Sequence, residues 1–90
     1  MEITENIRKG QIVKSKNGRD LGTVFVISDI LNQKYVEVVD GKTRLLEKPK
    51  KKNIKHLMIY KDVFEDFEKL DLKKFENNSK IRKKLKEYNN

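Results

Sequence analysis

Two short stretches of this 90-residue sequence concentrate positive charge where it could hold phosphate groups. The first is the polar loop 16–20, Lys-Asn-Gly-Arg-Asp, which lies between two apolar stretches and brings Lys16 and Arg19 close together. The second is 42–55, which contains seven Lys or Arg residues and a single acidic residue, Glu47. Lys and Arg bind nucleic acids by neutralising phosphates and releasing their condensed counterions. Both stretches therefore predict contact with a polyanion.

The charge of the whole chain is distributed unevenly. The formal net charge is +8, but residues 61–76 carry four basic and six acidic residues. From residue 77 onward, five basic residues face one acidic residue, Glu87. Charge that serves only solubility would not be segregated in this way. The segregation favours a polyanionic partner, although DNA would satisfy the charge as well as RNA.

The candidate nucleic-acid contacts are the basic residues of these stretches and their polar neighbours. They are Lys14, Lys16, Asn17, Gly18, Arg19, Lys42, Arg44, Lys48, Lys50, Lys51, Lys52, Lys55 and His56. Gly18 would allow a close approach of the backbone to a phosphate. Asp20 is better explained as a structural residue that caps the turn or holds Arg19. The alternative for both stretches is that their charges are simply solvated.

Other classes of function find little support. The chain has no Cys and a single His. The acidic stretch 62–76 is accompanied by no Ser–His–Asp constellation, no metal-ligand spacing and no phosphate-cradling glycine loop. We therefore expect no enzyme, metal, cofactor or small-molecule substrate. The longest apolar run, Val24 to Ile27, is too short to span a membrane. Residues 1–6 are acidic and polar, unlike a signal peptide, which predicts a flexible N-terminus and a cytoplasmic protein.

Two strands must position the loop 16–20. The pattern predicts them at Gln11–Ser15 and Gly22–Ile27, with Gly18 at a tight turn. The consecutive apolar residues of the second strand do not alternate with polar ones. At least one strand should therefore be covered on both faces.

A hairpin is predicted around Asp40-Gly41, because this dipeptide is typical of the two-residue type I′ turn. Its strands would be 35–39 and 42–46, with Val39 opposite Lys42. Pro49 cannot donate to a central strand, so a basic loop 48–53 would follow. A last strand is predicted over Ile54–Tyr60. Five short strands within 7–60 are typical of a small SH3-like barrel.

The remaining residues, 61–90, predict a helical extension. Val63, Phe64, Phe67 and Leu70 have helical spacing. A last helix would begin at the capping cluster Asn77-Asn78-Ser79 and carry an apolar stripe of Ile81, Leu85 and Tyr88. This stripe is a candidate cover for the outward side of Phe25 and Ile27. The other face of the helix is basic and could also meet phosphates.

Residues 7–59 resemble the KOW motif. The resemblance rests on Gly10-Gln-Ile-Val-Lys-Ser-Lys-Asn-Gly-Arg-Asp-Leu-Gly22 and on Asp40-Gly-Lys-Thr-Arg-Leu-Leu-Glu-Lys-Pro-Lys-Lys-Lys-Asn-Ile-Lys-His-Leu57. These stretches are similar to the KOW-containing large-subunit ribosomal proteins of archaea and eukaryotes and to their small bacterial relatives.

The resemblance implies a mainly β fold, a small SH3-like β-barrel of KOW type with one or two C-terminal α-helices. It also implies an RNA-binding protein of translation that contacts structured rRNA on the large ribosomal subunit through its basic loops. We expect it to act as a monomer, away from membranes. The alternative is a KOW-type protein-interaction module of the transcription or translation machinery.

Overall fold

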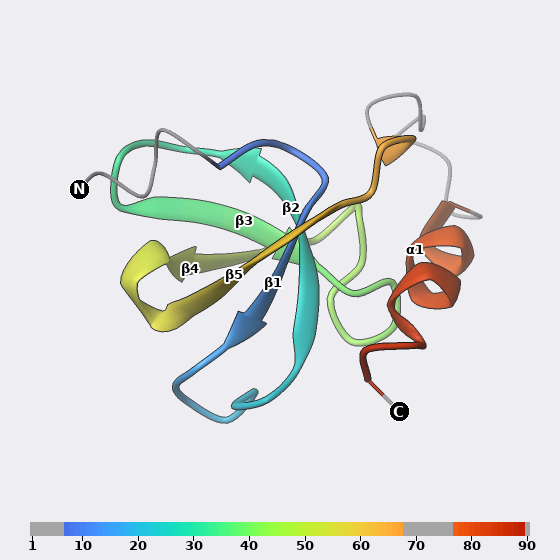
Figure 1. Ribbon diagram of the computed structural model, residues 1–90, viewed down its shortest axis with the longest axis horizontal. Helices are drawn as coiled ribbons and strands as arrows, with labels where there is room; N and C mark the ends of the chain where they lie inside the picture. Colours follow the sequence, from blue (N-terminus) through green and yellow to red (C-terminus); the bar gives the residue numbers. More distant parts are fainter. Residues whose placement is uncertain (1–6, 68–76, 90) are drawn as a thin grey trace.

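One antiparallel sheet and a C-terminal helix make up the part of the chain that the computed structural model describes, residues 7–67 and 77–89 (Figure 1). The elements are β1 Gln11–Ser15, β2 Val24–Ile30, β3 Tyr35–Val39, β4 Lys50–Asn53, the 3-10 turn η2 Ile54–His56, β5 Leu57–Val63 and α1 Asn77–Leu85. The five strands lie in the order β4-β3-β2-β1-β5. The predicted mainly β fold with a C-terminal helix is therefore confirmed.

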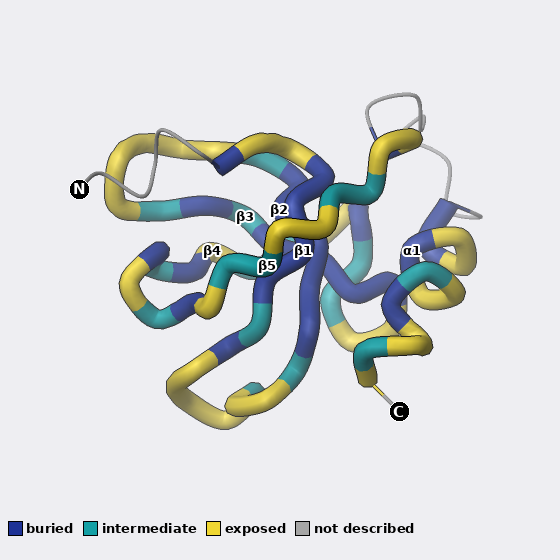
Figure 2. The backbone as a smooth tube through the Cα atoms, viewed as in Figure 1, coloured by how far each residue is buried: buried dark blue, intermediate teal, exposed yellow. Residues whose placement is uncertain are grey.

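β2 is the centre of the structure because both of its faces are buried (Figure 2). Phe25 and Ile27 belong to one apolar cluster, together with Val13, Val36 and Val38. The alternate residues of β2 belong to a second cluster, which lies between the sheet and α1. The prediction that a strand is covered on both faces is confirmed.

The helix covers a different face of β2 from the one predicted. Ile81 and Leu85 are buried, as the apolar stripe requires, but they share their cluster with Val24 and Val26. Successive side chains of a strand point to opposite faces. Phe25, predicted beneath the helix together with Ile27, therefore lies on the opposite face. An unbroken apolar run gave no indication of which face α1 would cover.

The loop between β1 and β2 forms where it was predicted. β1 has the predicted bounds, and Val13 pairs with Phe25 across the two strands. Gly18 adopts a φ of 83°, and the Leu21 amide donates to its carbonyl oxygen at 3.2 Å. β2 begins slightly later than predicted, at Val24.

The predicted hairpin at Asp40-Gly41 is wrong. A type I′ turn needs a positive φ at both central residues, and among the described residues only glycines have one, Gly41 included. Instead, Asp40 Oδ1 accepts the backbone N–H groups of Lys42, Thr43 and Arg44 at 2.9, 2.9 and 2.7 Å. The side chain thus folds 40–44 into a compact turn, and the predicted strand 42–46 does not form.

The fourth strand is β4, within the stretch predicted to be a basic loop. It starts directly after Pro49 and pairs with β3, placing Lys51 opposite Glu37 and Lys52 opposite Val36. The predicted last strand is also shifted. Residues 54–56 form η2, and β5 runs from Leu57 to Val63.

The first predicted helix of the C-terminal extension falls partly outside the described residues. Val63 ends β5, and Phe67 lies in a short turn after it. Leu70 lies outside the described residues, as do the predicted flexible residues 1–6. The last helix is confirmed as α1. Its Asn77-Asn78-Ser79 cluster lies inside the helix, where Asn77 and Asn78 are buried, and does not precede it.

Candidate nucleic-acid interface

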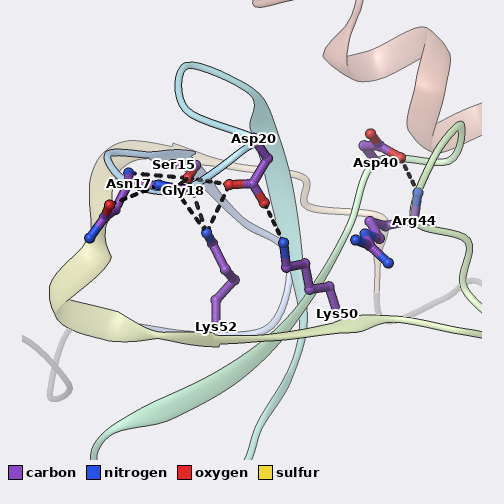
Figure 3. A network of polar contacts seen from close by, with 8 residues as sticks. All are labelled: Ser15, Asn17, Gly18, Asp20, Asp40, Arg44, Lys50 and Lys52. Carbon is purple, nitrogen blue, oxygen red and sulfur yellow. Dashed lines mark hydrogen bonds and ion pairs between the residues drawn. The ribbon is translucent and has the colours of Figure 1, made fainter.

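Asp20, in the loop between β1 and β2, is the centre of a polar network that ties this loop to β4 (Figure 3). Lys52 Nζ donates to Asp20 Oδ1 at 2.9 Å, and Lys50 Nζ donates to Asp20 Oδ2 at 3.0 Å. Ser15 Oγ also donates to Oδ1, at 2.7 Å. The side chains of Lys52 and Asp20 are only 9% and 16% exposed. Salt therefore screens this pair less than a surface pair, and the network holds the loop against β4.

The same network sets the charge of Asp20. Burial by itself would raise the pKa of this carboxyl group, but the hydrogen bonds from Lys52, Ser15 and Lys50 outweigh burial. Together they hold the pKa of Asp20 well below its usual range. The carboxylate is therefore ionised throughout the neutral range, and both lysines keep a charged partner.

The predicted structural role of Asp20 is confirmed, but its recorded ion-pair partners are Lys50 and Lys52 and not Arg19. Lys52 is one of the predicted phosphate contacts, and the structure places its ammonium group inside the protein. The physical reason is that β4 turns alternate lysines to opposite sides. Lys51 points away from the network and lies 4.4 Å from the centre of the Tyr35 ring.

A pocket of about 550 Å³ lies beside this network, between loop 16–23 and turn 40–44. We call it the loop pocket. Its cationic lining residues are Arg19, Lys42, Arg44 and Lys50. Figure 3 shows Lys50 extending from β4 to Asp20, and Arg44 to one side of it, below Asp40. Four cations from separate parts of the chain therefore line one concave surface.

Two carboxylates also line the loop pocket, and both already have partners. Asp20 is paired with two lysines. Asp40 accepts three backbone N–H groups of its own turn. The two lysines offset the charge of Asp20, whereas the N–H groups that bind Asp40 leave its negative charge in place. The pocket has four positive and two negative side chains, which favours binding of a phosphate group.

A second pocket, of about 770 Å³, lies between turn 40–44 and α1. We call it the helix pocket. Ser79, Arg82 and Lys83 of α1 line it, together with Lys86, which follows directly after the helix. Lys42 lines both pockets, as do Asp40 and Asn89. The two pockets are therefore neighbours, and we refer to them together as the basic groove.

Helix α1 lies beside the turn that replaced the predicted hairpin (Figure 1), and side-chain hydrogen bonds join the two. Asn78 Oδ1 accepts the Leu46 N–H at 2.7 Å, and Asn78 Nδ2 donates to Glu47 Oε1 at 2.8 Å. Arg82 Nη1 donates to the Gly41 carbonyl oxygen at 2.9 Å. These contacts fix the walls of the helix pocket relative to each other.

The chain end is attached to β2 by a side-chain amide. Asn89 Oδ1 accepts the Val24 N–H at 2.8 Å, and Asn89 Nδ2 donates to the Val24 carbonyl oxygen at 3.1 Å. The pairing of β2 with β3 stops at Val26 and Val39. The Asn89 amide therefore takes the place of a further strand residue, and it holds the last turn of the chain beside the groove.

The predicted contacts fall into three groups. Arg19, Lys42, Arg44 and Lys50 meet in the loop pocket. A second group, Lys16, Asn17, Gly18, Lys55 and His56, lies where the tip of the first loop meets η2, because the Lys16 amide donates to the His56 carbonyl oxygen at 2.8 Å. The rest do not line either pocket.

This last group is spread over separate surfaces. Lys14 lies on β1 between Val24 and Met58 of the neighbouring strands. Lys48 is exposed in the turn before β4. Lys51 and the buried Lys52 complete this group. Basic residues that are close in the sequence therefore need not share a surface.

The helix residues of the groove were missing from the candidate contacts. Ser79, Arg82, Lys83 and Lys86 follow the i, i+3, i+4, i+7 spacing of a single helix face. The sequence identified a basic face on the helix but not the turn that lies beside it, because residues 40–44 were expected to be part of a hairpin. The helical spacing of these residues was visible in the sequence. Their contact with turn 40–44, which is distant in the sequence, was not.

Within the described residues, no group of three or more His, Asp or Glu side chains is placed to hold a metal ion. In the same residues, no helix has the length and apolar character needed to cross a membrane. A scan against models of protein families finds no match for this chain, and a search of curated proteins finds none that is similar.

Proposed function

We propose that this protein binds structured RNA through the basic groove, and that its RNA is ribosomal, at or near the large subunit. The observation that carries the proposal is the convergence of Arg19, Lys42, Arg44 and Lys50, from three separate segments, on the loop pocket. A solvated lysine run needs no such convergence. The cations are held by folded elements, and Lys50 is oriented by Asp20 at 3.0 Å.

A small SH3-like barrel of KOW type is part of the same proposal. Each of the first four strands pairs with its sequence neighbour, and β5 returns to pair with β1. A single 3-10 turn separates β4 from β5. The registers of β1 with β5 and of β2 with β3 shift within the strands, and such irregularities bend a sheet. These features support a curled sheet in which the first loop and turn 40–44 lie on one side.

The groove would recognise RNA by its phosphates. Of the residues described as lining the two pockets, Phe25 is the sole aromatic, and it is buried. Stacking on unpaired bases, the usual way to hold single strands, therefore has no platform there. Double-stranded RNA is recognised mainly by its A-form shape and backbone. Cations held in fixed positions suit this kind of recognition, which would depend on the shape of the RNA and not on its base sequence.

Removing two of the converging cations should weaken RNA binding without unfolding the protein. We expect Arg19→Ala/Lys42→Ala to reduce the slope of log K against log salt by about 2 for an RNA duplex, since each lost phosphate contact removes about one unit. Both residues are exposed and outside the core, so the melting temperature should change little. Fluorescence anisotropy between about 50 and 200 mM salt measures the slope.

The matched control is Lys34→Ala/Lys61→Ala, which removes the same charge from exposed positions that line neither pocket. An equal change of slope in both double variants would make the effect one of net charge and would contradict the groove. Weak binding with little salt dependence would favour the protein-interaction module instead, because that function does not rest on phosphate contacts.

The ribosomal part of the proposal has a separate test. In sucrose gradients of cell lysate, the protein should migrate with large subunits at low salt and leave them as salt rises. The Arg19→Ala/Lys42→Ala variant should leave at lower salt than the wild type. Migration at the top of the gradient at every salt concentration would contradict a ribosomal partner.

A further inference from the structure

Helix α1 presents three different faces. One face is buried against the sheet through Ile81 and Leu85. A second face carries Lys80 and Lys84, which line neither pocket. The third face lines the helix pocket with Ser79, Arg82, Lys83 and Lys86. The positive charge of α1 is thus divided between a concave surface and an open one.

The concave face is held in place before any ligand arrives. Arg82 uses one guanidinium nitrogen to donate to the Gly41 carbonyl oxygen, and arginine has five N–H donors in all. Lys42 adds a cation from the opposite wall. The acidic residue of the pocket, Asp40, is engaged by three backbone N–H groups of its turn. The helix pocket therefore meets the requirements of a phosphate site.

The wall between the two pockets gives the shape of the ligand. Asp40, Lys42 and Asn89 line both pockets, and at the start of turn 40–44 Lys42 is exposed whereas Asp40 and Gly41 are buried. One exposed cation with a basic pocket on either side is complementary to the groove of a duplex, which lies between two phosphate backbones. The minor groove of A-form RNA is wide and shallow, and it would admit the Lys42 side chain.

We infer that the helix pocket is a second phosphate subsite, which binds the second strand of an RNA duplex whose first strand lies in the loop pocket. This inference rests on the proposed RNA-binding function and adds to it which strand of the duplex each pocket holds. Lys42, which lines both pockets, would lie between the two backbones. Arg82, Lys83 and Lys86 would contact the second of them.

The helix offers its own matched control. Lys83→Ala/Lys86→Ala removes two cations from the helix pocket, whereas Lys80→Ala/Lys84→Ala removes two from the same helix outside it. For an RNA duplex, the first variant should reduce the salt slope by about 2, and the second should leave the slope nearly unchanged. Circular dichroism melting of both variants checks that α1 remains folded to the same extent.

The ligand is tested by repeating the titrations with one of the two RNA strands alone. The Lys83→Ala/Lys86→Ala effect should then largely disappear, and an equal effect on the single strand would overturn the duplex assignment. Equal slope changes in the two helix variants would overturn the subsite, as would no change in either. In those cases wild-type protein would still bind RNA, whereas failure of the proposed function itself would show as no wild-type binding at all.

Discussion

Replacing Asp20 by Asn is expected to lower the free energy of unfolding by about 3 kcal/mol, because it leaves a buried ammonium group without its charged partner. The Lys52 side chain is 9% exposed and lies 2.9 Å from the Asp20 carboxylate. Lys50 loses its ion pair in the same variant. Urea unfolding followed by circular dichroism measures the change.

The control is Glu65→Gln, which removes the same charge from a surface ion pair. Glu65 and its partner Arg8 are 77% and 56% exposed, at 3.6 Å, so their pair contributes less than about 1 kcal/mol. If both variants lose the same small amount of stability, the Asp20 network has no more structural importance than a solvated pair. A large loss for Asp20→Asn alone is the expected result.

The Asp20 network should also make stability depend on pH. The folded state lowers the pKa of Asp20, so its contribution is complete above the unfolded pKa of about 3.9. The contribution is lost progressively as pH falls below about 5 toward the lower folded pKa. The difference in unfolding free energy between wild type and Asp20→Asn should therefore shrink between neutral pH and pH 3. A difference that stays constant would contradict the lowered pKa.

Replacing Gly41 by Ala is expected to cost at least about 2 kcal/mol and to displace α1 from the sheet. A Cβ atom at Gly41 would overlap the Asn78 carbonyl oxygen and lie 2.8 Å from the Arg82 nitrogen, both of which are helix backbone atoms. The φ of 75° adds strain for any L side chain. Urea unfolding followed by circular dichroism gives the stability.

Gly22→Ala separates the effect of overlap with the helix from the effect of a positive φ. Gly22 also has a positive φ, 89°, but a Cβ atom there would meet nothing within 4 Å. Its variant should lose only the conformational strain of about 1 kcal/mol. If the Gly41 variant is no less stable than the Gly22 variant, close packing of turn 40–44 on the helix is not important for stability.

Local signals were sufficient for the elements whose contacts are close in sequence. Gly18 between two apolar stretches predicted the first hairpin, because the turn and the strands depend on neighbouring residues. The spacing of Ile81 and Leu85 predicted α1 in the same way. Arg19 is exposed in the loop that was predicted, because the loop between two paired strands lies at the surface.

Elements fixed by long-range contacts were not predictable. Asp40-Gly41 has the composition of a type I′ turn, but Gly41 lies against α1, and Leu46 donates to Asn78, 32 residues away. Lys52 belongs to a lysine run that is typical of a solvated loop, yet Asp20 holds it inside the protein. In both cases a side chain distant in sequence decides the local structure. The position of the basic helix face beside turn 40–44 was not predicted for the same reason.

Competition between duplexes tests most directly whether the basic groove binds A-form RNA. Wild-type protein bound to a labelled RNA duplex is titrated with unlabelled RNA or DNA duplex of the same sequence, at several salt concentrations. We predict that RNA competes better than DNA, with a salt slope of about −5 if some six cations of the groove contact phosphates. Equal competition by DNA, or binding that does not weaken with salt, would contradict binding of A-form RNA by the groove.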